Sequence, residues 1–327
     1  MSMPNRLRNL LKEKKYLITP GVGSPFQAMV VEKVGFDIVY MSGYSTSLSI
    51  LGLPDVGLIT EVEMVNNARN ISRSVRIPVI ADADTGFGNA INTIRTVKDY
   101  ESAGVAGIHI EDQVSPKRCG HLAGKLLIPI EEAVGKVKAA VAAKTDPDFV
   151  IIARTDAIAA VGGGFEEAVR RGKAFARAGA DMVFCEFTSP DPSEPKKFAE
   201  EIHKEFPNLP LFFNYSSSFK WYESDLTFDD IANMGYKIIV VSLGCLRVSL
   251  QSIWDYAVDL LNRKENAEKD FEKRIRGHPT EDFNKFAGFP LIKELEAKYL
   301  PSEEFETKYR ASLGLYGSGE NGKLSKK

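Results

Sequence analysis

Eight short apolar segments, rich in β-branched residues and bounded by turn-forming residues, recur along most of this 327-residue chain. Amphipathic stretches with helical period lie between them, for example at 61–75, 90–103, 130–143 and 165–178. Strict alternation of strand and helix predicts parallel strands joined by crossover helices. Eight repeats favour a closed (β/α)₈ barrel of the TIM type, whereas the alternative, an open doubly wound sheet, usually has fewer strands. The predicted strands are 17–19, 38–41, 79–81, 107–110, 150–153, 182–185, 211–213 and 238–241.

The periodic pattern ends near residue 262, so we expect residues 1–262 to form a catalytic barrel domain. Residues 263–316 read as short charged helices with too little apolar surface for a core of their own. We expect this C-terminal helical extension to pack on the barrel or on a neighbouring subunit. The tail, 317–327, is rich in Gly, Ser and Lys and is predicted to be disordered.

The charge balance argues against two classes of partner. Lys and Arg number 42 and Asp and Glu 44, a formal net charge of −2, so no basic field attracts nucleic acid or an anionic membrane. No apolar run approaches the length of a membrane span. The first residues lack the features of a signal peptide, and three scattered cysteines do not make a disulfide framework. We therefore expect a cytoplasmic protein with reduced thiols.

Carboxylates gather where two predicted strands end, and in a barrel the strand ends carry the active site. Asp82 and Asp84 follow the third strand, and Glu111 follows the fourth. Because alternate side chains share a face, Asp82 and Asp84 should point together. Three convergent carboxylates repel one another unless a cation lies among them, and oxygen ligands suit Mg²⁺, or Mn²⁺ in its place. The alternative is that 84–86 form a simple turn and that Asp82 caps a helix.

A basic cluster, Lys117-Arg118-Cys119-Gly120-His121, lies in the loop after the fourth strand. Cationic neighbours lower the pKa of a thiol and prepare it for proton transfer, and a basic loop suits a lid over an anionic substrate. We therefore expect Cys119 to be an exposed catalytic acid, with His121 beside it. The alternative is a solvated basic loop with an incidental cysteine.

These motifs and their spacing resemble the isocitrate lyase and phosphoenolpyruvate mutase superfamily over about residues 18–255. The motifs that carry the resemblance are YMSG at 40–43, DADTGFGN at 82–89, GIHIEDQ at 107–113, KRCGH at 117–121 and ARTDA at 153–157. The resemblance implies a (β/α)₈ barrel that uses Mg²⁺ and acts on α-oxycarboxylates. The KRCGH loop resembles the lyase branch, since the phosphoenolpyruvate mutases lack its cysteine.

The resemblance also implies roles for individual residues. Asp82 would coordinate Mg²⁺, with Asp55, Asp84 and Glu111 reaching the ion directly or through water. Cys119 would be the acid. Glu186 would orient the leaving half of the substrate, and Arg154 would hold the substrate and steady the nascent carbonyl. The remaining residues implied to bind substrate are Ser42, Gly43, Tyr44, Lys117, Gly120, Phe184, Asn214, Ser216, Ser218, Ser242 and Arg247. The C-terminal helices resemble those that family members pack on or exchange with a partner barrel, so we expect a homotetramer built from dimers.

The implied activity is Mg²⁺-dependent cleavage of a small 2-hydroxy polycarboxylate by a retro-aldol (Claisen-type) reaction, with Tyr40 as one candidate base. Isocitrate would yield succinate and glyoxylate, and 2-methylisocitrate would yield succinate and pyruvate. Phe184 stands where isocitrate lyases have Trp, and the space gained should admit the extra methyl group. We therefore predict cleavage of both substrates with 2-methylisocitrate preferred, although Tyr44 could refill part of that space.

Two alternatives to this activity remain. Ser242 is characteristic of oxaloacetate hydrolases, so oxaloacetate hydrolysis, or cleavage of dimethylmalate on the same scaffold, is the first rival. The second is a barrel that binds a metabolite without catalysis. The presence of the acid, the metal carboxylates and Arg154 argues against it.

Overall fold

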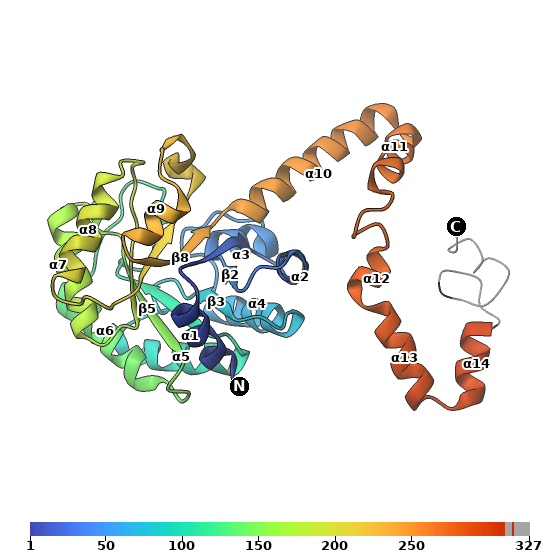
Figure 1. Ribbon diagram of the computed structural model, residues 1–327, viewed down its shortest axis with the longest axis horizontal. Coiled ribbons are helices and arrows are strands. Elements are labelled where there is room, and N and C mark those ends of the chain that lie inside the picture. Colours follow the sequence, from blue (N-terminus) through green and yellow to red (C-terminus); the bar gives the residue numbers. More distant parts are fainter. Residues whose placement is uncertain (311–315, 317–327) are drawn as a thin grey trace. The chain divides into compact units, whose positions relative to one another are not determined.

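Eight parallel strands close into a barrel in chain order, with β1 hydrogen-bonded to β8 (Figure 1). The structure is a computed structural model that describes residues 1–310 and 316. The predicted barrel is confirmed, and the open sheet is excluded. The strands are β1 (Leu17–Val22), β2 (Val39–Met41), β3 (Val79–Asp82), β4 (Gly107–Glu111), β5 (Val150–Thr155), β6 (Met182–Cys185), β7 (Leu211–Asn214) and β8 (Tyr236–Val241).

Helices follow the strands and cover the outside of the barrel (Figure 1). In the first part of the chain they are α1 (Met3–Glu13), α2 (Pro25–Val34), α3 (Gly43–Leu51), α4 (Glu61–Ser74), α5 (Ala90–Ala103), α6 (Ile130–Ala143), α7 (Phe165–Arg177), α8 (Ser193–His203), α9 (Phe228–Asn233) and the 3₁₀ turns η1 (Ala157–Ala159), η2 (Ser217–Phe219) and η3 (Trp221–Glu223). After them come α10 (Gly244–Arg263), α11 (Glu265–Ile275), α12 (Phe283–Ala287), α13 (Phe289–Tyr299) and α14 (Ser302–Arg310).

Local sequence explains where these helices begin. At the start of α4, the Thr60 side chain accepts from the Glu63 N–H, and the Glu63 carboxylate accepts from the Thr60 N–H. This capping box satisfies two backbone donors that the first turn leaves unpaired. The bounds of α5 and α6 agree with the helical period of the sequence, since apolar side chains every three to four residues must face the strands.

The barrel interior is an apolar layer of side chains that point inward from alternate strand positions. Tyr40, Ile80, Phe184 and Phe212 belong to this layer, and Leu7 of α1 joins it beside the first residues of the strands. The N-terminal end of the barrel is therefore closed by apolar packing, which leaves the C-terminal ends of the strands for polar side chains.

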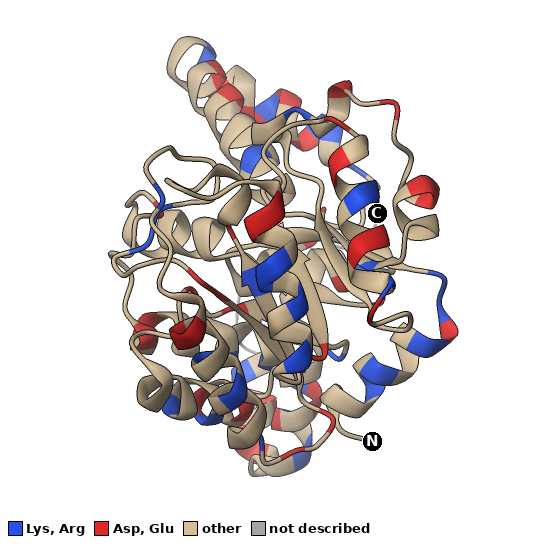
Figure 2. Cartoon of the chain, turned by 90° about the vertical axis from the view of Figure 1, so that its left-hand side faces the viewer, with Lys and Arg blue, Asp and Glu red and all other residues tan. Residues whose placement is uncertain are grey.

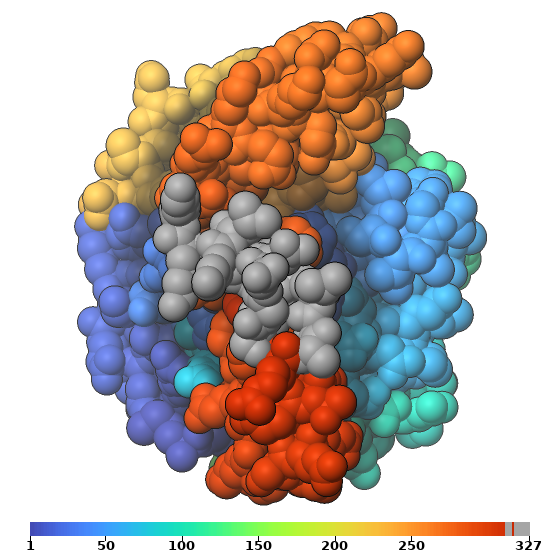
Figure 3. Space-filling view, turned by 90° about the vertical axis from the view of Figure 1, so that its right-hand side faces the viewer, coloured from blue at the N-terminus to red at the C-terminus, as the bar shows by residue number. Residues whose placement is uncertain are grey.

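The chain divides into two compact units, Met1–Gln251 and Ser252–Lys327. The division lies within α10, a continuous helix that begins at Gly244, whereas the sequence pattern predicts a boundary after residue 262. Among the described residues of α11 to α14, which Figure 3 colours orange to red, Ala267 alone is buried. Their packing on the barrel or on a partner stays a prediction, and the predicted tail, 317–327, lies outside the described residues.

Charged residues of both signs are distributed over the helices and loops around the barrel (Figure 2). This distribution agrees with the nearly balanced composition, a formal net charge of −2. None of the described helices combines the length and the apolar character needed to cross a membrane.

Candidate active site

A polar pocket lies at the C-terminal ends of the strands, directly above the apolar layer. Alternation produces it, because the residue two positions after an inward-facing apolar one faces the same way. Ile80 is followed by Asp82, Phe184 by Glu186, and so on around the barrel. The pocket is lined by Tyr40, Ser42, Tyr44, Asp55, Asp82, Lys117, Cys119, Gly120, His121, Arg154, Glu186, Asn214, Ser242 and Leu243.

One side of the pocket is a cluster of buried carboxylates around Lys117. The Lys117 ammonium lies 2.6 Å from Asp55 Oδ1 and 2.9 Å from Asp84 Oδ1. Burial opposes the charge of Lys117, yet Asp84 and Asp55 hold its pKa well above the ordinary value. Of the predicted basic loop, Lys117 is thus buried as the counter-ion of these carboxylates, whereas Arg118 is exposed.

Asp82 connects this cluster to the start of α3 and to β4. Its Oδ2 accepts from the Gly43 N–H over 3.0 Å, and its Oδ1 lies 3.6 Å from Nε2 of His109. A Cβ at position 43 would lie only 2.6 Å from Asp82 Oδ2, so glycine is required there for the close approach. Ser42 caps α3 by accepting from the Ser45 N–H.

The donors of this side suit a hydrated Mg²⁺ better than a fully liganded ion. Burial raises the pKa of Asp84 to about 7, and Glu111 Oε1 has no hydrogen-bond partner, so added positive charge would stabilise both carboxylates. The described residues contain no group of three or more Asp, Glu, His or Cys side chains arranged to hold an ion directly. Mg²⁺ commonly takes one or two carboxylates and keeps several waters, which fits Asp82 with Asp84 nearby.

Unlike Asp55, Asp82 and Glu186, Asp84 does not line the pocket, and neither does Glu111. Glu111 Oε2 lies 3.4 Å from Nε of Arg154, so a guanidinium is its nearest counter-charge. Asp84 approaches Asp82 by a turn and not by strand alternation, since β3 ends at Asp82 and Asp84 has φ +46°.

The opposite side carries Cys119 and His121. Cys119 Sγ lies 3.3 Å from His121 Nδ1, and His121 Nε2 lies 2.8 Å from Ser216 Oγ. Cys119 is 5% exposed, and burial raises its pKa to about 12, with Asp55 adding to the effect. The expectation of an exposed thiol with a lowered pKa was therefore wrong. Burial outweighs the cationic neighbours, of which Lys117 is paired with carboxylates.

Arg154 is the centre of a buried network beside the thiol. It donates to Asp156 through Nε over 3.0 Å and through Nη2 over 2.9 Å, and Nη2 lies 3.1 Å from Glu186 Oε2. Asn214 donates to both Glu186 oxygens over 3.0 and 3.2 Å. Burial raises the pKa of Glu186 to about 7, although Arg154 opposes the shift. The network fixes a guanidinium and a carboxyl group on the pocket wall.

Gly120 allows the loop to close against this network. A Cβ there would lie 2.6 Å from Arg154 Nη2 and 3.2 Å from Glu186 Cγ, inside the ordinary contact distance. The residue after the thiol can thus touch the guanidinium only because it has no side chain.

Five predicted substrate-binding residues lie outside the pocket lining: Gly43, Phe184, Ser216, Ser218 and Arg247. Gly43 and Ser216 lie directly behind it, bonded to Asp82 and His121. Phe184 faces the same side as Glu186 but lies two residues, roughly 6–7 Å, deeper in the barrel, where its ring lies 4.9 Å from the Arg154 guanidinium carbon. Ser218 is exposed because η2 ends the alternation after Ser216. Arg247 is exposed on α10.

Sequence reasoning missed two residues of the site. Leu243 lines the pocket beside Ser242. His109 is fully buried beneath it, with Nε2 2.9 Å from the Tyr40 hydroxyl. Its position on the inward face, two residues before Glu111, was the available signal. Burial lowers the pKa of His109 to about 4 and raises that of Tyr40 well above its ordinary value, so both are neutral.

Comparison with known proteins gives consistent relatives. Residues 7–261 match the phosphoenolpyruvate phosphomutase family. The chain is 41% identical to an isocitrate lyase of Haloferax volcanii over 297 residues, which cover 90% of this chain and 86% of that protein. It is 43% identical to a 2-methylisocitrate lyase of Aeropyrum pernix over 247 residues, 75% and 76% of the two chains.

Comparison with solved structures agrees with this family match. A phosphonopyruvate hydrolase, solved in complex with oxalate and Mg²⁺, superposes with a TM-score of 0.79 at 31% identity, covering 92% of this chain and 100% of that one. The three names describe different reactions, so likeness alone does not choose among substrates. The chain belongs to the phosphoenolpyruvate mutase and isocitrate lyase superfamily.

Proposed function

We propose that the chain is a Mg²⁺-dependent lyase that cleaves isocitrate or 2-methylisocitrate to succinate and a 2-oxo acid. Its similarity to isocitrate and 2-methylisocitrate lyases supports a carbon–carbon lyase of this superfamily. The observation that carries the finer proposal is the Cys119–His121 pair, 3.3 Å between Sγ and Nδ1, which faces the same small pocket as Arg154. Such a thiol can deliver a proton to a carbanion inside a closed site.

The cleavage requires one proton to leave and another to arrive. The hydroxyl on C2 of the substrate loses its proton, the C2–C3 bond breaks, and the electron pair moves to C3, which is stabilised as a carboxylate enediolate. Cys119 then gives its proton to C3 and becomes a thiolate. Because the pKa of the thiol is about 12, the proton is present at neutral pH before the reaction begins.

Tyr40 is the proposed acceptor of the hydroxyl proton. Its oxygen lines the pocket and lies 2.9 Å from Nε2 of His109, which is neutral because burial lowers its pKa to about 4. Tyr40 can therefore pass its own proton to His109 as it takes one from the substrate. Asp82, with Asp84 and Asp55 nearby, would hold Mg²⁺, which supplies Lewis-acid polarisation of the substrate's hydroxyl and carboxylate oxygens when bound.

A panel of four substrates tests this proposal. Isocitrate, 2-methylisocitrate, dimethylmalate and oxaloacetate are each incubated with the enzyme and Mg²⁺, and the 2-oxo acid, succinate, acetate and oxalate are quantified. Succinate with glyoxylate or pyruvate supports the proposal. Failure on both tricarboxylates with turnover of oxaloacetate to oxalate and acetate would overturn it.

One observation favours that rival activity as the second candidate. Ser242 lines the pocket, and its buried Oγ has no hydrogen-bond partner. A free hydroxyl could bind a hydrated ketone such as that of oxaloacetate. Ser242→Ala should then abolish oxalate formation while leaving tricarboxylate cleavage within about threefold.

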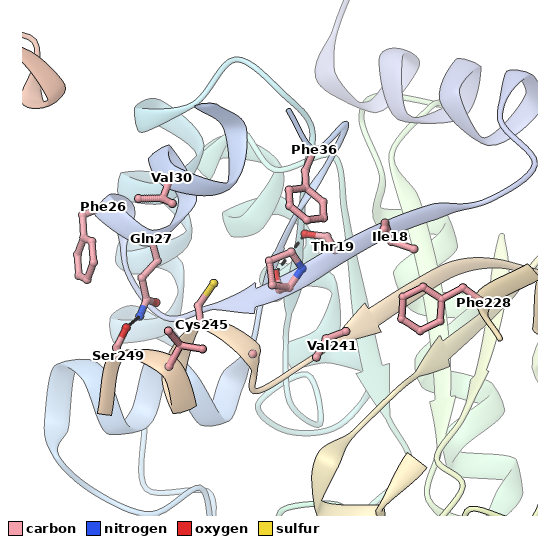
Figure 4. A pocket seen from close by; sticks show the side chains of 13 residues that line it. Ile18, Thr19, Phe26, Gln27, Val30, Phe36, Phe228, Val241, Cys245 and Ser249 are labelled. Atoms are coloured by element: carbon pink, nitrogen blue, oxygen red, sulfur yellow. Dashed lines mark hydrogen bonds between the residues drawn. The ribbon is translucent and has the colours of Figure 1, made fainter. Parts of the chain in front are cut away.

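The proposed homotetramer has support in the exposed apolar surface. An apolar groove of about 490 Å³ lies on the outer wall of the first unit, between α2 and the start of α10 (Figure 4). Phe26 and Val248 line it and are 59% and 66% exposed, and Trp254 further along α10 is 72% exposed. Exposed apolar side chains gathered in a groove are typical of a protein–protein interface.

Light scattering tests the assembly. We expect the mass of a tetramer at micromolar concentration, a lower mass for Val248→Asp, and no change for Ile91→Asp, a control at an exposed apolar residue outside the groove. A monomeric mass for the unmodified chain would refute the proposal. The cytoplasmic location stays a prediction.

A further inference from the structure

The segment that carries Cys119 is the long connection from β4 to α6, and little regular structure holds it. Its base is closed by an antiparallel bridge between Gln113 and Leu127, and the Val114 N–H donates to the Leu126 carbonyl over 2.8 Å. Between these residues the backbone forms neither helix nor strand. The place of Cys119 therefore depends on individual contacts: its own N–H donates to the Asp55 carbonyl over 3.0 Å, and side chains hold its two neighbours.

Lys125 holds the residue that follows the thiol. It is 1% exposed, and its ammonium donates a hydrogen bond to the carbonyl of Gly120. The same ammonium lies 4.0 Å from Asp156 Oδ1. A buried cation is costly unless it is paired, and here its two partners are a loop carbonyl and a residue that follows directly after β5. Lys125 thus ties the loop to the barrel.

Gln113 holds the residue that precedes the thiol. Its Oε1 accepts from the Arg118 N–H over 2.9 Å, and its Nε2 donates to the Arg118 carbonyl over 2.8 Å. The side chain is 2% exposed. It therefore pairs with Arg118 as a neighbouring strand would, on the other side of Cys119 from Lys125.

Asp156 joins both anchors to the substrate-binding side. It accepts two hydrogen bonds from Arg154, and it interacts with Lys125 and Gln113 as well. Burial opposes its charge, yet Arg154, Lys125 and Gln113 together hold its pKa below the ordinary value. One ionised carboxylate therefore contacts the guanidinium and both loop anchors.

We propose that Lys125 and Gln113 are positioning residues that, anchored on Asp156, hold the two neighbours of Cys119 at a fixed place beside Arg154. Neither touches the pocket, so both act through the residues they hold. The inference rests on the proposed role of Cys119 as acid. The position of the thiol can nevertheless be tested without any turnover.

Lys125→Met is the central test, because methionine keeps most of the volume and loses the charge. The rate at which iodoacetamide modifies Cys119 is measured in the full-length, substrate-free enzyme, with peptide mass spectrometry to separate it from Cys185 and Cys245. We expect alkylation to be at least about 10-fold faster, because release of the loop exposes the thiol. We expect kcat to fall about 100-fold, since misplacement of about 1 Å costs that much, while KM changes by less than about threefold.

Three further variants make the result specific. Lys138→Met, at an exposed lysine of α6, should match the unmodified enzyme in both assays. Lys125→Arg should restore most of the protection of Cys119, and Gln113→Leu should change both measurements in the same direction as Lys125→Met. The melting temperature of each variant identifies any that fails to fold.

The outcomes separate the two proposals. Faster alkylation in folded Lys125→Met supports the positioning role, even in an enzyme that cleaves none of the tricarboxylates, which would overturn only the proposed function. Unchanged alkylation and unchanged kcat in folded Lys125→Met would overturn the positioning role while leaving the lyase proposal intact.

Discussion

The two sides of the pocket are held in place by different means. Asp82 is the last residue of β3, so its backbone belongs to the hydrogen-bonded ladder of the barrel, where it pairs with His109 of β4. Cys119 lies in an irregular loop and depends on its N–H, which donates to the Asp55 carbonyl over 3.0 Å, and on the side chains that hold its neighbours. The strand side, where Asp82 would hold the proposed metal, is thus fixed by the barrel ladder. The loop side, which carries both Lys117 and Cys119, is fixed by individual contacts.

This difference has a consequence for how each side should respond to change. A substitution on the strand side removes charge from a frame that persists, because the ladder does not depend on that side chain. A substitution on the loop side can move the thiol, because few other contacts fix it. Variants of the two sides should therefore differ in melting temperature and in the accessibility of the thiol.

Removal of the divalent ion should have the largest effect. EDTA should abolish turnover, and Mg²⁺ or Mn²⁺ should restore it, because the site collects carboxylates that Lys117 alone neutralises only in part. Asp82→Asn should lose turnover, and it should lose Mn²⁺ binding as measured by electron paramagnetic resonance. Its melting temperature should be unchanged. Asparagine keeps one oxygen for the Gly43 or Asp84 N–H. Asp99→Asn, at a partly exposed carboxylate of α5 that pairs with Arg95 outside the pocket, is the control.

Full activity in a preparation shown to be free of metal would remove the metal ion from the mechanism. A large drop in the melting temperature of Asp82→Asn would instead show that the strand side is not an independent frame.

Cys119→Ser should follow, with a loss of about 10²–10⁴-fold in kcat and little change in KM, because a hydroxyl is a far weaker acid than a thiol. Cys245→Ser, at a half-buried thiol outside the pocket, should be close to normal. Steady-state kinetics on the preferred substrate make the measurement. Near-normal turnover by Cys119→Ser would mean that another group delivers the proton.

The pH dependence of alkylation measures the state of the loop. The thiolate reacts with iodoacetamide, and the pKa of Cys119 is raised to about 12, so the rate should still rise about tenfold per unit from about pH 8 to about pH 10. Because Cys119 acts as an acid and keeps its proton over this range, ionisation of the thiol should not lower kcat between about pH 8 and about pH 10. A plateau near the ordinary thiol pKa would indicate an open, solvated loop. Substrate with Mg²⁺ should protect the thiol.

Substitutions in the substrate pocket should give the smallest effects. Phe184→Trp should change the ratio of kcat/KM for 2-methylisocitrate and isocitrate by less than about threefold, because Phe184 lies beneath the pocket. Tyr44→Gly, at a lining residue, should shift the ratio toward 2-methylisocitrate by roughly 10-fold or more. Tyr44, and not Phe184, should therefore limit how strongly 2-methylisocitrate is preferred. A larger effect at Phe184 than at Tyr44 would show that Phe184 sets the substrate preference.

The barrel and most residues at its polar end can be predicted from the pattern of the sequence. Strand alternation and helical period are local patterns, set by which side chains must be buried, and they can be read without knowing what packs where. The same reasoning placed Asp82, Arg154 and Glu186 at strand ends. It also identified the KRCGH loop as chemically unusual.

Which side chains are buried, how deep they lie and which residues they contact depend on the folded barrel. Phe184 shares a face with Glu186, but the sequence pattern does not say whether the pocket reaches down as far as the ring of Phe184. The pKa of Cys119 depends on burial and on Asp55, which lies 64 positions away in the sequence and carries no mark of the contact. Lys125 and Gln113 look like ordinary loop residues until the fold brings Asp156 to them. These properties arise from contacts through space, so they were fixed only when the barrel closed.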